Sequence, residues 1–330
     1  MLSILLPCVW RMVSDMSGIC PYCNSARSIL IGNVFCSNHN KEMKALESGT
    51  LYIKQKSLEE TDWHVSRLSI RCMVKGEQYY KTGSKESLVN PNNFLVINQG
   101  QRYKTSFKGD NDSEMLLVAF KPGFAEGVYQ SMTQKQEWLL DNYGNQKDHK
   151  LSFFEKTYET DEVIKNVFSG LYNLLHETDV EFKKQLDLDG LYTKLVERLI
   201  ALNFSIVENI QQGGQLKAST KIELYKRLCI ARDYMQVYYC KNVTLDEIAG
   251  VACLSVHHFK RQFNAYFKIT PHRYIMLLRL QKARQLLKET GLTVKEICGK
   301  VGFENDSSFI RLFRDNYGIT PAVFRSTVIR

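Results

Sequence analysis

Aromatic residues recur with the period of a helix in the last third of the chain, and the same pattern occurs twice. The recurring rings are Phe259, Phe263 and Phe267 in the first copy, and Phe309, Phe313 and Tyr317 in the second. This spacing places the rings on one face of a helix. Because large apolar rings are stabilised by removal from water, each triplet predicts an amphipathic helix packed on a core.

Each aromatic helix is preceded by the start signal of a shorter helix. Thr244 is followed three residues later by Glu247, and Thr293 is followed in the same way by Glu296. In such a capping box the hydroxyl and the carboxylate bond the free amides of the first turn. The copies are offset by 49 residues at these threonines and by 50 at their closing Thr-Pro pairs. Two short helices joined by a tight turn predict a helix-turn-helix in each copy.

The outward face of each second helix is polar and mainly basic. Its residues are His257, His258, Lys260, Arg261 and Asn264 in the first copy, and Asp306, Ser307, Ile310, Arg311 and Arg314 in the second. Arginine can form two hydrogen bonds to guanine, His, Ser and Lys reach bases or phosphates, and an apolar side chain can touch a thymine methyl. A solvated helix surface is the alternative interpretation. Recurrence of this face in two matched copies favours DNA contact.

Between the copies, residues 271–290 predict a single helix with Pro271 at its first position. Its twenty residues, rising about 1.5 Å each, extend about 30 Å. Successive major-groove segments on one side of a duplex lie about 34 Å apart. The predicted length therefore suits a link between two recognition helices, and Lys282 and Arg284 on it are predicted to contact phosphate.

Residues 221–326 resemble the DNA-binding domain of the AraC/XylS family of bacterial transcription regulators. The resemblance is carried by the tandem motif, the linking helix and, in the second copy, Gly302-Phe303-Glu304, Ser308-Phe309, Arg311-Leu312-Phe313-Arg314, Tyr317-Gly318-Ile319-Thr320-Pro321 and Phe324-Arg325. It implies base contacts by His257, Lys260, Arg261, Asp306, Ser307, Ile310 and Arg311. The first copy departs from the pattern at Cys253, where the second has Gly302. A non-glycine residue in the left-handed conformation of such a turn costs on the order of 1 kcal/mol.

Charge is divided unevenly along the chain. From Lys217 to the end there are 20 Lys or Arg against 9 Asp or Glu, a net charge of +11, whereas residues 1–216 carry −2. A basic excess confined to the repeat domain is the electrostatic mark of a nucleic-acid binder. Binding to a membrane surface would instead need an exposed apolar helix face, and the aromatic faces are already assigned to cores.

No stretch approaches the roughly 18 apolar residues of a membrane-spanning helix, and the apolar start Met1–Trp10 lacks the preceding basic residues of a signal peptide. The nine cysteines are odd in number and scattered, and Cys229 and Cys298 fall at core positions of predicted helices. These features predict a cytoplasmic protein with reduced thiols.

Residues 1–42 form an N-terminal tail of uncertain structure, and Met43 is a second plausible start of translation. The spacing Cys-x2-Cys-x12-Cys-x2-His, which suits tetrahedral zinc, is formed by Cys20, Cys23, Cys36 and His39. No strand or turn pattern frames these residues. Unrelated side chains in a tail are therefore the competing interpretation.

The pattern changes to period two in residues 43–122. Leu68, Ile70, Cys72 and Val74 alternate with other residues, and further short apolar runs are bounded by Gly, Asn or Pro. Such runs predict a β-sandwich or barrel. The segment resembles the small cupin-like barrel that many AraC-type regulators carry as a sensor.

The resemblance to a sensor implies a pocket for a small-molecule effector. The candidate pocket residues are Trp63, His64, Arg67, Arg71, Tyr79, Tyr80 and Tyr103. Arg67 and Arg71 would suit an anionic effector. Cupin metal chemistry needs two His and a third ligand, whereas this segment contains only His64, so neither a metal nor another cofactor is predicted.

Residues 123–210 return to a helical period. The candidate helices are 124–140, 161–177 and 188–207. The last two carry more apolar surface than a lone helix can hide, which leaves a homodimer contact and packing on the barrel as alternatives. Residues 211–217 are rich in Gln and Gly and predict a linker. Residues 218–330 are assigned to the DNA-binding domain.

The predicted fold class is α+β multidomain: a cupin-like β-barrel followed by helices, then an all-α tandem helix-turn-helix domain. The predicted function is an effector-responsive transcription regulator, with activation and an RNA polymerase contact expected, that reads two adjacent major-groove segments of double-stranded DNA. It is predicted not to be an enzyme. One alternative is a cupin-type metal enzyme with a DNA-binding tail, which would hold stoichiometric metal. The other is an alkyl-accepting DNA-repair regulator, which would take methyl groups from damaged DNA.

Overall fold

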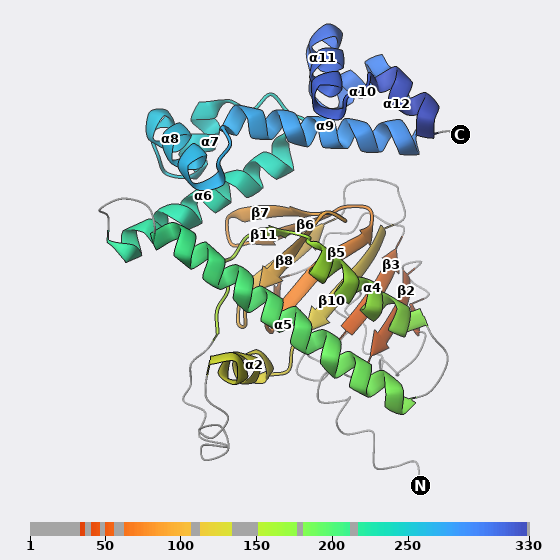
Figure 1. The fold of residues 1–330 in the computed structure, drawn as a ribbon, viewed down its shortest axis with the longest axis vertical. Coiled ribbons are helices and arrows are strands. Elements are labelled where there is room, and N and C mark those ends of the chain that lie inside the picture. Colours follow the sequence, from red (N-terminus) through yellow and green to blue (C-terminus); the bar gives the residue numbers. More distant parts are fainter. Residues whose placement is uncertain are drawn as a thin grey trace. The chain divides into compact units, whose positions relative to one another are not determined.

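The computed structural model describes residues 34–36, 41–46, 50–55, 63–106, 113–133, 151–176, 181–211 and 217–328 of the 330-residue chain. The chain divides into two compact units, Met1–Asn209 and Ile210–Arg330, and each is described by itself (Figure 1). The first unit contains strands and helices, whereas the described part of the second is helical. The predicted order, a sheet region followed by helices, is confirmed.

The strands of the first unit form two sheets. The seven-stranded sheet consists, in spatial order, of β1 (Val34–Cys36), β2 (Lys41–Leu46), β3 (Thr50–Gln55), β10 (Ser113–Ala119), β5 (Ser69–Lys75), β8 (Asn93–Ile97) and β11 (Thr157–Glu159). The four-stranded sheet consists of β4 (His64–Val65), β9 (Arg102–Ser106), β6 (Gln78–Thr82) and β7 (Lys85–Val89). Neighbouring strands in both sheets run antiparallel.

The described strands do not close into the predicted barrel, because no backbone ladder joins the two sheets among them. Alternation along a sequence indicates where strands are but not which strands pair, so it could not decide between two sheets and a closed barrel. The large sheet also begins earlier than predicted. The predicted boundary between tail and barrel, at residues 42 and 43, falls inside β2, which pairs with β3 from Glu42 to Leu46.

Alternation along the central strands gives the large sheet two different faces. On β5, Ile70 and Cys72 belong to a cluster that includes side chains of two helices. Arg71 lies on the opposite side, where its guanidinium meets Tyr103 of β9. A second apolar cluster on that side contains Tyr80 and Tyr103 of the small sheet with residues of β5, β8 and β10. The first unit is therefore layered as helices on sheet and sheet on sheet.

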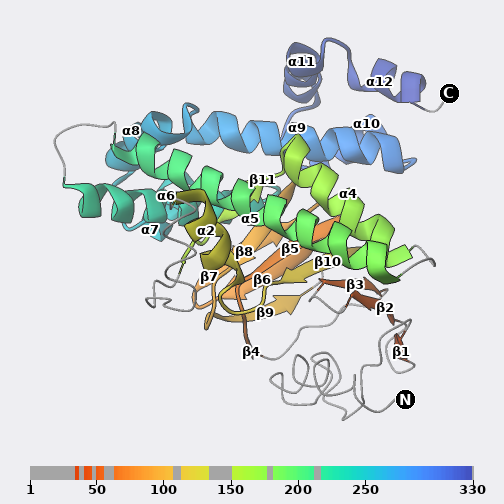
Figure 2. The same ribbon diagram turned by 60° about the horizontal axis from the view of Figure 1, so that its bottom comes forward.

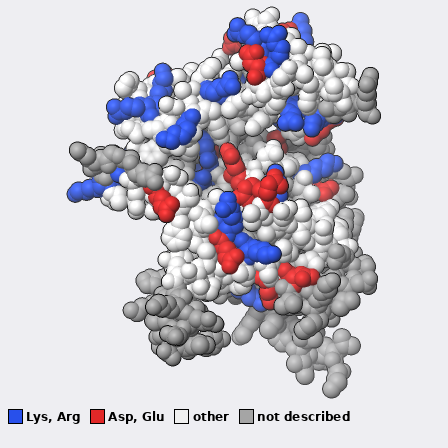
Figure 3. Space-filling view, viewed as in Figure 1, with Lys and Arg blue, Asp and Glu red and all other residues white. Residues whose placement is uncertain are grey.

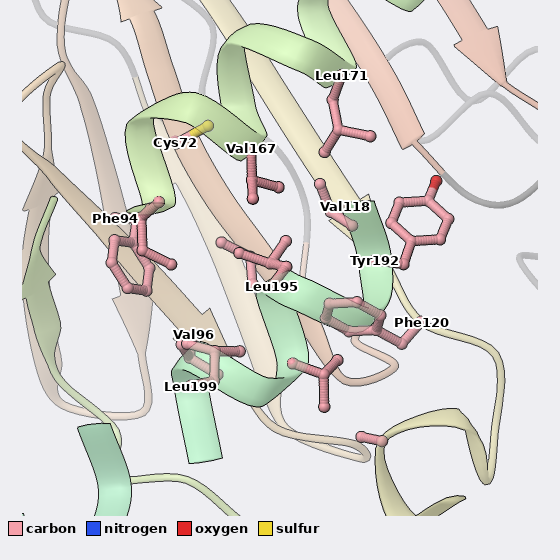
Figure 4. Packing of buried hydrophobic residues seen from close by; sticks show 14 of the residues in the cluster. Cys72, Phe94, Val96, Val118, Phe120, Val167, Leu171, Tyr192, Leu195 and Leu199 are labelled. Carbon is pink, nitrogen blue, oxygen red and sulfur yellow. The ribbon is translucent and has the colours of Figure 1, made fainter. Parts of the chain in front are cut away.

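The described helices of the first unit are α2 (Phe124–Thr133), α4 (Glu162–His176) and α5 (Glu181–Gln211). α4 and α5 lie over the seven-stranded sheet (Figure 2), where Val167 and Leu195 pack with Phe94 in one cluster (Figure 4). Asp161, just before α4, accepts a 2.7 Å hydrogen bond from Arg198 of α5. The apolar faces of these helices thus pack within their own unit, which is one of the two alternatives that the sequence left open.

The second unit is built from seven described helices. They are α6 (Ala218–Tyr238), α7 (Leu245–Val251), α8 (Val256–Phe267), α9 (Pro271–Glu289), α10 (Val294–Lys300), α11 (Asp306–Tyr317) and α12 (Pro321–Val328). α7 with α8 forms the first helix-turn-helix, α10 with α11 forms the second, and α9 links them (Figure 1). None of the helices in the described part of the chain is both long and apolar enough to span a membrane.

Candidate nucleic-acid interface

Both predicted capping boxes are present at the starts of α7 and α10. The hydroxyls of Thr244 and Thr293 accept hydrogen bonds from the amides of Glu247 and Glu296, and the two carboxylates accept from the threonine amides. Hydrogen bonds from the Thr293 backbone and hydroxyl hold the pKa of Glu296 below its usual value. These caps fix where each helix-turn-helix begins.

The second helix of each helix-turn-helix also begins at a defined cap. The hydroxyl of Ser255 accepts from the amide of His258 at 3.4 Å. The side-chain oxygen of Asn305 accepts from the amides of Ser307 and Ser308, at 2.8 and 3.2 Å. Asn305, and not its neighbour Asp306, is therefore the cap of α11, which leaves Asp306 as the first residue of the helix.

The inner faces of α8 and α11 are aromatic, as predicted. Phe259, Phe263, Phe309 and Phe313 are all completely buried. Successive rings touch: the centroids of Phe259 and Phe263 are 5.4 Å apart, and those of Phe309 and Phe313 are 5.8 Å apart. Since these faces are held in cores, the rotation of each helix about its own axis is fixed, and the opposite face must point outward.

The outward faces carry the residues predicted to contact DNA. The exposed members are His257, Lys260, Arg261 and Asn264 on α8, and Asp306, Ser307, Ile310, Arg311 and Arg314 on α11. His258 is only half exposed. Among the described residues, no ion pair engages Arg261, Arg311 or Arg314, so these guanidinium groups are available to a partner. Figure 3 shows Lys and Arg side chains gathered over the region of α8 and of α11.

The linking helix α9 has 19 residues, which corresponds to about 28 Å. The first helix-turn-helix lies at one end of α9 and the second at the other (Figure 1). The guanidinium of Arg284 lies 5.2 Å from the ring centroid of Tyr317 and 5.6 Å from that of Phe324. Lys282 lies 3.4 Å from the side-chain oxygen of Gln285. Arg284 therefore packs on the second helix-turn-helix and on α12, in addition to any contact with phosphate.

Each helix-turn-helix contains two positions with a left-handed backbone. The first has Cys253 at φ 52° and Lys268 at φ 56°, and the second has Gly302 at φ 91° and Gly318 at φ 79°. The left-handed turn expected at Cys253 is confirmed. Lys268, the C-cap of α8, was not indicated by any sequence signal except its alignment with Gly318 in the repeat.

The candidate effector residues divide into two groups. Arg71, Tyr80 and Tyr103 are buried between the sheets: Arg71 donates to the Tyr103 hydroxyl at 2.8 Å, and the rings of Tyr80 and Tyr103 are 6.4 Å apart. His64 joins them, with its ring 5.8 Å from that of Tyr103. Gln78, a buried residue absent from the sequence-based set, accepts a hydrogen bond from the Tyr80 hydroxyl, and its amide nitrogen has no hydrogen-bond partner among the described residues. Its position two residues before Tyr80 places it on the same strand face, a signal that could have identified it.

The remaining candidates of that set lie away from this group. Trp63 is 40 % exposed, and its ring contacts the side chains of Arg102 and Lys104. Arg67 and Tyr79 are half buried, and Tyr79 alternates with Tyr80 along β6. The structure therefore gathers His64, Arg71, Tyr80 and Tyr103 but not these three.

The candidate zinc ligands fall almost entirely outside the described residues. Cys20, Cys23 and His39 are not among them, and Cys36 ends β1, where side-chain surroundings are not described. Within the described part of the chain there is no group of three or more His, Cys, Asp or Glu arranged to hold a metal. Among the cysteines whose side chains the structure describes, Cys72, Cys253 and Cys298 are free thiols.

Comparison with known proteins agrees with the geometry of the second unit. Residues 248–327 match the family described as Helix-turn-helix domain. The probable transcriptional regulator LumQ of Photobacterium leiognathi is 24 % identical over 220 residues, 67 % of this chain and 74 % of that protein. The uncharacterized HTH-type transcriptional regulator YdeC of Bacillus subtilis is 23 % identical over 270 residues, 80 % of this chain and 84 % of that protein.

Among solved structures, an AraC-type transcriptional regulator from Chromobacterium violaceum is 27 % identical, with a TM-score of 0.30, and the match covers 34 % of this chain and 98 % of that one. Neither alternative considered above, a metal enzyme or a repair regulator, is supported by these relatives. The matched domain, the similarity to transcription regulators and the paired motifs show that this chain is a DNA-binding transcription regulator that carries an AraC-type helix-turn-helix domain near its C-terminus.

Proposed function

We propose that the second unit reads two adjacent major-groove segments of double-stranded DNA, one with α8 and one with α11. The observation that carries the proposal is the pairing itself. Two capped helices each bury an aromatic face and expose a basic one, and a single helix of about 28 Å joins them. Successive major-groove segments lie about 34 Å apart on one side of the duplex, within reach of such a pair.

In this proposal Arg261 and Arg311 read bases, because both are exposed near the middle of their helices and are free of ion pairs within the described chain. Arginine forms two hydrogen bonds with guanine in the major groove. His257, Lys260, Ser307 and the apolar Ile310 complete the two surfaces, and Ile310 is 38 % exposed. Since the two helix-turn-helix motifs repeat head to tail, the two half-sites have the same orientation, and the complete DNA site is asymmetric.

Selection of bound DNA from a random pool by the full-length protein tests this proposal. We expect a consensus of two half-sites about 10 base pairs apart in direct orientation. Strong binding without sequence preference would contradict it, because the basic faces would then hold phosphate only.

We further propose that the first unit is a cupin-like sensor for an anionic small molecule. Arg71 is 4 % exposed and lies between the two sheets, and its Nε has no hydrogen-bond partner within the described chain. No described carboxylate forms an ion pair with it. Leaving a buried charge uncompensated costs on the order of several kcal/mol. A bound anion would neutralise the Arg71 guanidinium. The amide nitrogen of Gln78, which has no partner among the described residues, would donate a second hydrogen bond to that anion.

Thermal unfolding of the full-length protein with a panel of small carboxylates and phosphates tests the sensor. At least one anion is expected to raise Tm in the natural protein and to leave Arg71→Met unchanged. Lys75→Met, at an exposed position of the same strand, is the matched control and should keep the response. An unresponsive natural protein, or an Arg71→Met protein that responds equally, would contradict the assignment.

The remaining parts of the proposal concern partners and setting. We propose a cytoplasmic regulator without catalytic activity or cofactor, which contacts RNA polymerase when bound at a promoter. We also propose that α5 supplies a homodimer contact, since Phe204 on this helix is 45 % exposed although large and apolar. Sedimentation of the natural protein and Phe204→Ser tests the dimer, because loss of this ring should shift the equilibrium to monomer.

A further inference from the structure

The turn of the second helix-turn-helix packs against backbone that precedes the first. A methyl group added at Gly302 would lie 2.6 Å from the carbonyl oxygen of Cys240 and 3.0 Å from its carbonyl carbon. Cys240 lies just beyond the end of α6 and four residues before Thr244, the cap of α7. The second turn therefore approaches the main chain between α6 and α7, and α6 itself packs on α7 and α8 of the first helix-turn-helix.

A single side chain of the linking helix bonds to the same place. Nε of Arg279 donates to the carbonyl oxygen of Tyr239 at 2.7 Å, and Nη2 donates to that of Lys241 at 3.1 Å. The guanidinium carbon is 5.8 Å from the ring centroid of Phe303 and 3.2 Å from the position of a methyl group at Gly302. We call residues 239–241, Arg279, Gly302 and Phe303 the central contact.

The position of Arg279 along α9 gives this contact its mechanical importance. It lies close to the midpoint of the helix, eight residues after Pro271 and ten before Glu289. Each helix-turn-helix packs on one end of α9. The central contact is therefore an additional connection between the two motifs, near the middle of this helix. Arginine suits this position because its planar fork can bond two carbonyl oxygens and stack on a ring at the same time, which lysine cannot do.

The first helix-turn-helix differs from the second at the matching position. The position equivalent to Gly302 is Cys253, whose side chain is exposed. The contact is therefore not a by-product of duplicated sequence. In the second turn, a glycine permits the close approach to the Cys240 carbonyl.

We propose that Arg279 is a positioning residue that fixes the phase between α8 and α11 and thereby sets the half-site spacing that the protein accepts. This rests on the proposed reading of two half-sites. Inserting one base pair moves the next groove segment by about 3.4 Å along the duplex and rotates it by roughly 34°. Two recognition helices locked through the central contact cannot follow both changes, whereas two helices joined only by α9 can adapt to them.

The test uses the full-length protein and DNA carrying the two selected half-sites at the selected spacing, or with one or two base pairs inserted or removed. DNA with a single half-site is measured in parallel. For the natural protein we expect each one-base-pair change to weaken binding roughly tenfold or more. For Arg279→Met we expect unchanged binding to the single half-site and a loss of only about two- to threefold on altered spacing.

Two further variants separate positioning from general damage. Arg273→Met removes a charge from the exposed first turn of the same helix, and it should weaken binding to all DNAs alike while keeping the spacing preference. Arg279→Lys keeps the charge but not the forked geometry, so it should relax spacing as Arg279→Met does. If Arg279→Met fails to fold, Arg279→Lys carries the comparison.

The outcomes separate this inference from the proposed function. If the natural protein selects no paired half-sites, the proposed function fails and the inference fails with it. If the natural protein prefers one spacing sharply and both Arg279 variants keep that preference, only the inference is overturned. A spacing preference relaxed in both Arg279 variants but retained in Arg273→Met supports it.

Discussion

The two helix-turn-helix motifs have the same buried aromatic face and the same capping box at the start of the first helix, but different residues occupy their left-handed positions. The first helix-turn-helix has Cys253 and Lys268 at these positions, whereas the second has Gly302 and Gly318. Space around these positions differs as well. A methyl group at Gly318 would meet no atom within 4 Å, but one at Gly302 would collide with the Cys240 carbonyl. A left-handed turn thus tolerates an ordinary side chain in open space, and glycine becomes necessary where backbone approaches backbone.

The largest effect is expected for Gly302→Ala. The added methyl group meets a carbonyl oxygen at 2.6 Å and occupies a left-handed position, so it should destabilise the second unit by roughly 2–4 kcal/mol. Gly318→Ala has the same backbone strain without the collision and should cost only about 1 kcal/mol. Urea unfolding followed by circular dichroism compares the two variants. Equal losses would show that the backbone approach at Gly302 contributes nothing.

Next in size are the two arginines proposed to read bases. Arg261→Ala should cost roughly 1–3 kcal/mol of binding and relax the preference at one base of the first half-site, and Arg311→Ala should do the same at the second. Binding of each variant to DNAs substituted one base at a time locates the lost preference. Equal losses on selected and random DNA would contradict base reading by that unit.

Substitutions on the linking helix should act in two different ways. Arg284→Ala removes a guanidinium stacked on Tyr317 and Phe324, so it should destabilise the second unit by about 1 kcal/mol. Lys282→Ala should leave stability nearly unchanged, weaken binding to every sequence alike and reduce the salt slope by about one. DNA titrations at several salt concentrations, together with thermal unfolding, distinguish the effect on stability from the effect on phosphate binding. A Lys282→Ala variant that loses preference at a single base would contradict the phosphate assignment.

The smallest effect is expected for Cys253→Gly. Glycine relieves left-handed strain of about 1 kcal/mol but adds freedom to the unfolded chain, so a net gain below about 1 kcal/mol is expected. Cys253→Ala keeps the β-carbon and should give no gain. Thermal unfolding of the two variants decides. A gain for both would place the cost at the thiol and not in the backbone.

The sequence predicts the second unit well because its signals are local. Capping boxes at Thr244 and Thr293 and rings spaced by four residues each lie within one or two helical turns, so they locate the elements of both motifs. The central contact could not be predicted in this way. Arg279 bonds carbonyl groups about forty residues earlier, and nothing in its own helix distinguishes it from the other basic residues there.

The first unit was less predictable for a related reason. Alternation from Leu68 to Val74 indicates a strand with two faces, but both faces of β5 are buried, one by helices and one by the second sheet. The sequence therefore could not show that Arg71 lies inside while Trp63 is exposed. Short strands with weak alternation, such as β2, give little signal before their partners are known.

The contact of Gly302 with Cys240 also bears on how the domain folds. The second motif completes its turn against main chain that comes before the first, and Arg279 takes its acceptors from residues 239 and 241. A fragment beginning after Lys241 would keep both recognition helices yet lose those acceptors. The duplicated motifs are therefore not independent modules: they should melt together in one cooperative transition, although their sequences are two copies of one pattern.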